Sequence, residues 1–245
     1  MNGTQKGNAL IYVLIAIAAF AALSYSITRD SRTTGNFSQD AAFAASGIMQ
    51  YGTRLENAVE TLVSTGTDIP QISFENSVVA GYANAAATNA NKVFHPDGAG
   101  VIYTAPEADW LDSAQAAEPL YGEWYFAANV CVPFMGSGDT TCNSDGSANT
   151  EDLVVFLPYI TKDICLNINR RMDIASCATD DPCDDSAGNM WPPANTKFTG
   201  SFADGEAAYN VGGAYLFKNS GCLEGSGANT PPAGTYTYYK VLLAR

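Results

Sequence analysis

The stretch KGNALIYVLIAIAAFAALSYSITR, from Lys6 to Arg29, contains no charged residue between its two ends. Residues 7–28 are therefore 22 uncharged residues in a row, and a helix of that length rises about 33 Å at about 1.5 Å per residue. The hydrocarbon core of a bilayer is about 30 Å thick, so the stretch predicts a membrane-spanning helix. Whether this helix is removed or retained decides what the rest of the chain does.

A secretory signal peptide is one alternative for this stretch. It has a basic residue, an apolar core and a small-x-small cleavage site at Ser24-Tyr25-Ser26, which would leave Ile27 as the mature start. Signal peptides usually carry a cluster of positive charge before the core, whereas here only Lys6 precedes it. This feature favours a retained helix.

A short polar leader that ends in Lys6-Gly7 directly before the apolar run resembles the type IV prepilins and pseudopilins. In that family a dedicated peptidase cuts after the glycine on the cytoplasmic side, and the helix is retained as anchor and later as filament core. The resemblance implies residues 1–7 as leader, cleavage between Gly7 and Asn8, and residues 8–28 as the transmembrane and filament-core helix. Leu10 and Ile11, at mature positions three and four, fit the family pattern.

Two mature positions depart from the family pattern. The first residue is usually phenylalanine or methionine and is Asn8 here, while the fifth is usually glutamate and is Tyr12 here. In the family, that glutamate is thought to pair with the terminal ammonium of a neighbouring subunit, because a buried charge needs a partner. The tip-type minor pseudopilin of type II secretion also lacks it, so Tyr12 favours a minor subunit over the repeating one.

A second, amphipathic helix is predicted over residues 29–66, continuing from the membrane into the body as a pilin's first helix does. Gly35 marks a break within this range, and Ser38 or Asp40 is suited to cap the helix that resumes after it. Gly66 is suited to end the helix. The alternative is a membrane helix followed by an unrelated domain helix. The predicted buried stripe recurs at helical spacing and consists of Phe43, Ile48, Tyr51 or Gly52, Leu55, Val59 and Leu62.

Residues 67–245 are predicted to form one disulfide-bonded, β-rich globular body. Aromatic and β-branched residues indicate strands within residues 122–134, 152–160, 207–218 and 234–245, and a hairpin at 92–103 around Pro96-Asp97-Gly98. Residues 161–172 predict a short helix, and loops are expected at 136–149, 180–189 and 219–234. The fold class is therefore α+β, with a long membrane-spanning and amphipathic helix packed on an antiparallel sheet, as in pilins.

Six cysteines follow the apolar stretch, with no CxxC pair and a single histidine. This pattern predicts disulfides formed in an oxidising compartment, which places the body on the non-cytoplasmic side. Six cysteines allow fifteen pairings. The short loops that they would close favour the pairs Cys131–Cys142 and Cys177–Cys183, which leaves Cys165–Cys222 as the third pair.

Charge and motifs exclude several classes of function. The net charge of −13 argues against nucleic-acid binding, which needs a basic surface. The single histidine, His95, flanks a turn proline, and neither GxSxG nor a phosphate-binding glycine motif is present, so no enzyme activity is expected. Calcium is the one cofactor considered, in two acidic loops that do not match the EF-hand spacing, with a solvated loop as the simpler alternative. Its candidate ligands are Asp145, Asp152, Asp180, Asp181, Asp184 and Asp185.

The predicted function is that of a structural subunit, a minor pilin or pseudopilin, in a type IV pilus-like or type II secretion filament. Its expected partners are other such subunits, the prepilin peptidase and the bacterial inner membrane, which it would cross once with a periplasmic or extracellular body. The alternative is a single-pass envelope protein whose body binds a ligand such as glycan, because aromatic rings such as those of tryptophan can stack on sugars. The three tryptophans are Trp110, Trp124 and Trp191.

Overall fold

A computed structural model describes two compact units of the chain, Met1–Ser38 and Gln39–Arg245. The first unit contains one described helix, and the second contains all the other elements. The described residues are 12–20, 39–132, 134–136, 151–175, 182, 196–202, 207–208, 215, 217–225 and 232–245.

The helix of the first unit covers residues 12–20. Its large apolar side chains, from Tyr12 to Phe20, are between 58% and 76% exposed. No helix within the described parts of the chain is both long and apolar enough to span a membrane. Of the predicted segment 8–28, residues 8–11 and 21–28 lie outside the described residues.

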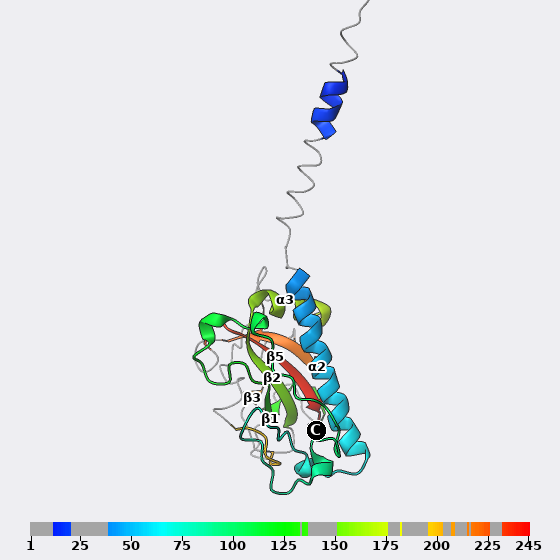
Figure 1. The fold of residues 1–245 in the computed structure, drawn as a ribbon, viewed down its shortest axis with the longest axis vertical. Helices are drawn as coiled ribbons and strands as arrows, with labels where there is room; N and C mark the ends of the chain where they lie inside the picture. Colours follow the sequence, from blue (N-terminus) through cyan, green and yellow to red (C-terminus); the bar gives the residue numbers. More distant parts are fainter. Residues whose placement is uncertain are drawn as a thin grey trace, which may run out of the picture. The chain divides into compact units, whose positions relative to one another are not determined.

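Helix α2 covers Gln39–Ser64 and is the longest element of the body (Figure 1). The predicted range was 29–66, of which residues 29–38 lie outside the described residues. The helix ends in a Schellman motif, in which the Gly66 amide donates to the Val63 carbonyl and the Thr67 amide to the Leu62 carbonyl. Gly66 has φ +96°, a conformation that glycine adopts without strain.

The apolar stripe of α2 is buried as predicted, with one error. Ile48, Leu55 and Val59 are fully buried, whereas Phe43 is 74% exposed and was wrongly assigned to the stripe. The buried positions of the first turns are small instead: Ala41, Ala44 and Ala45. Helix α3 packs against α2, and small side chains allow two helices to approach closely (Figure 1).

The sheet has the strand order β3-β1-β2-β5-β4, and its four longer strands are antiparallel. Helix α2 packs along β5. The two-residue strand β3 pairs parallel to β1, which the expectation of a purely antiparallel sheet did not include. The fold is therefore α+β, a long helix on an antiparallel sheet. The elements are β1 Tyr125–Cys131, β2 Asp152–Ile160, α3 Lys162–Arg171, β3 Ala207–Ala208, β4 Ser220–Glu224 and β5 Tyr236–Leu243.

Three local predictions were wrong in whole or in part. Of the strand predicted within residues 207–218, only Ala207–Ala208 is a strand, and the described residues 215, 217 and 218 are not in one. Strand β4 lies in the predicted loop 219–234, because pairing with β5 overrides the weak strand preference of Ser220 and Gly221. The hairpin predicted at residues 92–103 forms only in part, since neither arm is a regular strand. The Gly98 amide donates to the His95 carbonyl in the expected turn, and the two arms are joined by the hydrogen bonds from the Ala99 amide to the Lys92 carbonyl and from the Val101 amide to the Val93 carbonyl. The Val93 amide in turn donates to the Ser73 carbonyl, so the stretch also pairs with an earlier part of the chain.

Residues 65–124 cover the body without forming a regular strand. Their aromatic side chains pack into the core, where the Phe74 ring stacks on Phe126 at 4.0 Å between centroids. Trp124 is 1% exposed and donates its indole N–H to the Thr104 carbonyl. Four short 3-10 turns punctuate the stretch: Ile69–Gln71, Asn89–Asn91, Ala108–Trp110 and Ser113–Gln115.

The predicted Cys165–Cys222 disulfide is present and joins α3 to β4. Both cysteines are fully buried and lie 57 residues apart in sequence, a loop for which cross-linking stabilises the folded state by about 4 kcal/mol. Cys131 is also disulfide-bonded, whereas Cys142, Cys177 and Cys183 lie outside the described residues.

Candidate functional surface on helix α2

The residues that define the proposed cleavage site, Gly7 and Asn8, lie outside the described residues. Tyr12, which the proposed cleavage would place at the fifth mature position, is the first described residue of the helix 12–20, and its side chain is 67% exposed.

The structure describes one of the six candidate calcium ligands, Asp152, which lies in strand β2 and is fully buried. One carboxylate oxygen accepts from the Val132 amide at 2.8 Å and the other from the Arg245 amide at 3.0 Å. Burial raises the pKa of Asp152 to about 7. Asp152 thus joins the end of β1 to the C-terminal residue.

Within the described ranges no three His, Cys, Asp or Glu side chains are grouped to hold a metal ion. The other candidates, Asp145, Asp180, Asp181, Asp184 and Asp185, lie outside those ranges.

The remaining sequence candidates have local structural roles where they are described. The Nδ1 atom of His95 accepts from the Asp97 amide at 3.1 Å and holds the turn. Trp124 belongs to the core and Trp110 is half-buried. Trp191, the tryptophan expected to be most exposed, lies outside the described residues.

The inner face of α2 is fixed to strand β5. Glu56 and Lys240 form an ion pair at 2.8 Å, and the lysine side chain is only 8% exposed. At Gly52, an added Cβ would lie 2.4 Å from the Tyr238 hydroxyl oxygen, so the helix can approach β5 this closely only with glycine there. These contacts hold the helix in one orientation and so determine which side chains face outward.

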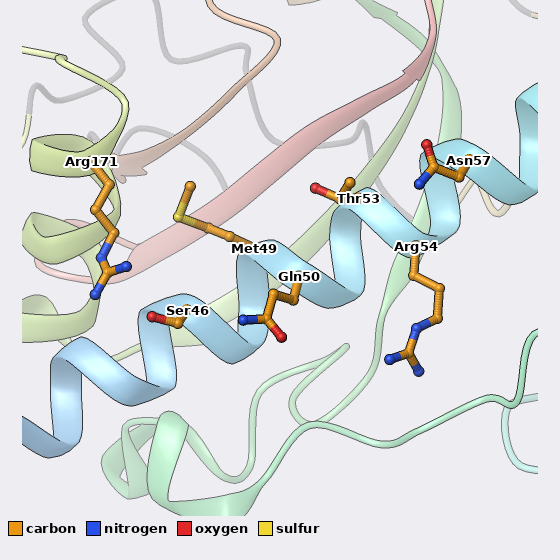
Figure 2. A pocket seen from close by; sticks show the side chains of 7 residues that line it. All are labelled: Ser46, Met49, Gln50, Thr53, Arg54, Asn57 and Arg171. Atoms are coloured by element: carbon orange, nitrogen blue, oxygen red, sulfur yellow. The ribbon is translucent and has the colours of Figure 1, made fainter.

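The outer face of α2 forms a shallow groove with the end of α3 (Figure 2). Its volume is about 540 Å³. Arg171, from α3, donates to the Ala42 carbonyl at 3.0 Å and so places its guanidinium beside α2. Among the described residues, no acidic side chain lines the groove. The lining residues, which we call the α2 groove, are Ser46, Met49, Gln50, Thr53, Arg54, Asn57 and Arg171.

The sequence analysis did not identify this surface, because the apolar stripe predicts only the buried face of the helix. A signal was present: uncharged polar residues recur at helical spacing on the opposite side, at Ser46, Gln50, Thr53 and Asn57. The contribution of Arg171 had no sequence signal, since it depends on how α3 packs.

Arg54 is the most distinctive residue of the α2 groove. It is exposed, and within the described part of the chain it makes neither a hydrogen bond nor an ion pair. Burial raises the pKa of the neighbouring Tyr51, whereas the Thr104 amide and the charge of Arg54 lower it. An exposed guanidinium beside uncharged polar side chains is suited to binding an anionic group.

Comparisons of the chain with protein-family models, with curated proteins and with solved structures found no match.

Proposed function

We propose that the protein is a minor subunit, pilin or pseudopilin, of a type IV pilus-like or type II secretion filament. One observation carries the proposal: an exposed apolar helix at residues 12–20 precedes α2, whose apolar face packs on an antiparallel sheet. This order of elements supports a subunit that is anchored by its first helix and presents a folded body beyond it.

The proposed assembly step follows from the environment in which the apolar helix and the folded body are each stable. An apolar helix is stable in lipid and equally so among other apolar helices, so it can exchange a bilayer for a filament core. The prepilin peptidase would cut between Gly7 and Asn8 before that exchange. The body would face the periplasm or the exterior, where an oxidising environment maintains the Cys165–Cys222 bridge.

Mass spectrometry of the mature N-terminus tests this proposal. We expect membrane fractions to contain a chain that starts at Asn8, and we expect the uncut chain in cells that lack the prepilin peptidase. A Gly7→Leu variant should also stay uncut, because in the family that the leader resembles the peptidase cuts after a glycine. A start at Ile27 would contradict the proposal and indicate a secreted protein.

The alternative, a single-pass envelope protein that binds a ligand such as glycan, predicts a different result. Its chain would stay uncut in membranes whether or not the peptidase is present, and crosslinking of intact cells would find it only as a monomer.

A further inference from the structure

We propose that the α2 groove is a docking site for an acidic protein segment, with one carboxylate group bound by Arg54 and a second near Arg171. This inference goes beyond the proposed function, since it holds for a partner inside or outside a filament.

The first argument is the state of Arg54. The other described basic side chains are engaged within the chain: Lys92 with Glu75, Lys197 with Glu123 and Lys240 with Glu56, among others. The protein carries 25 acidic residues against 12 basic ones, so carboxylates outnumber cations twofold, yet none of those in the described part of the chain lines the groove beside Arg54. An exposed guanidinium that has no hydrogen-bond or ion-pair partner among the described residues offers its planar fork of donors to an external carboxylate.

The second argument is the spacing along the helix. Arg171 is held at the Ala42 carbonyl, and twelve residues of helix, 54 minus 42, correspond to a rise of about 18 Å. An extended peptide covers that distance in about five or six residues. Gln50, Thr53 and Asn57 lie along the groove, and their amide and hydroxyl groups suit the backbone of such a peptide (Figure 2).

The third argument concerns the type of partner. A long polyanion such as nucleic acid would meet the repulsion of a chain with net charge −13. A short segment with a few carboxylates interacts with the two arginines of the α2 groove, whereas most of the acidic body is too far away to repel it strongly. Charge complementarity therefore favours a local acidic stretch on another protein.

Fluorescence anisotropy with the full chain in detergent tests this inference. The probe is a labelled, end-blocked octapeptide with two glutamates at each end and four uncharged residues between them. The matched probe carries glutamine in place of every glutamate. We expect the glutamate peptide to bind, and Arg54→Ala to weaken its binding at least fivefold. Arg54→Lys should retain part of the affinity, since it keeps the charge and loses the fork.

The control variant is Lys92→Ala, which removes the same unit of charge at a site away from the groove and should leave binding unchanged. Thermal unfolding should be nearly the same for Arg54→Ala and the wild type, because the side chain is exposed and makes no hydrogen bond or ion pair with the described residues. Equal binding of the glutamine peptide, equal loss in Arg54→Ala and Lys92→Ala, or no binding at millimolar peptide would each overturn the inference. So would equally tight binding of an eight-nucleotide single-stranded DNA. The assay involves no filament, so its failure would leave the proposed function untouched.

Discussion

The helix at residues 12–20 and helix α2 are both rich in alanine and aliphatic residues, but they differ in what surrounds them. In residues 12–20 the large apolar side chains are more than half exposed, whereas in α2 Ile48, Leu55, Val59 and Leu62 are almost completely buried. The second helix thus obtains its stability from contacts inside its own chain. The first presents an apolar surface that the described part of the chain does not cover. The proposed function assigns that surface to lipid and then to other filament helices.

A matched pair of substitutions sharpens this contrast most strongly. Leu55→Ala removes a fully buried side chain and should lower the free energy of unfolding of the body by about 3 kcal/mol. Leu14→Ala removes the same atoms from a side chain that is 60% exposed and should leave body stability within about 0.5 kcal/mol. Denaturant unfolding of both variants in detergent, followed by tryptophan fluorescence, measures the difference. Equal losses would mean that residues 12–20 pack on the body.

A pH titration examines how the body is held together. The pKa of Asp152 is raised from 3.8 to about 7 by burial. Between these values the folded state binds a proton that the unfolded state has released, so stability is greatest at low pH and falls as pH rises. From pH 5 to pH 6.5 the free energy of unfolding should fall by about 2 kcal/mol from this group.

The Asp152→Asn variant isolates that effect, because asparagine does not ionise. Chemical denaturation at both pH values should show this part of the slope in the wild type and its loss in the variant. A variant that keeps the full slope would assign the pH dependence to other groups.

Local sequence patterns predicted most of the longer helices and strands, because the apolar residues that define each pattern are the ones that the fold buries. The strand at residues 152–160 and the helix around Cys165 follow from their own residues. Strand β4 does not, since Ser220 and Gly221 become a strand only through pairing with β5. Phe43 was misassigned because periodicity alone does not reveal that α3 packs beside the small residues of α2. The α2 groove was missed for the same reason, since Arg171 reaches it from another helix.

The contact at Gly52 gives a smaller effect on the inner face of α2. Gly52→Ala would bring a methyl group to 2.4 Å from the Tyr238 hydroxyl oxygen, and the resulting shift should destabilise the body by about 1–2 kcal/mol. Tyr238→Phe removes that oxygen, after which the nearest Tyr238 atom to the added methyl is at 3.3 Å. The double variant should therefore recover part of the loss, as measured in a double-mutant cycle. Strict additivity would show that this approach does not limit the packing of α2.

The smallest expected effect is that of Tyr12→Phe, in the exposed apolar helix at residues 12–20. A neutral phenol in lipid finds a carbonyl or the interface for its hydroxyl, so removing the hydroxyl should change neither membrane insertion nor filament yield. Tyr12→Glu should insert nearly as well and yet disturb assembly, because a minor subunit at the tip offers no neighbouring ammonium for the new charge. Filament yield or secretion in cells that carry each variant in place of the wild type measures both outcomes. If the glutamate variant assembled better than the wild type, Tyr12 would be a tolerated defect in a repeating subunit, and the assignment as a minor subunit would be wrong.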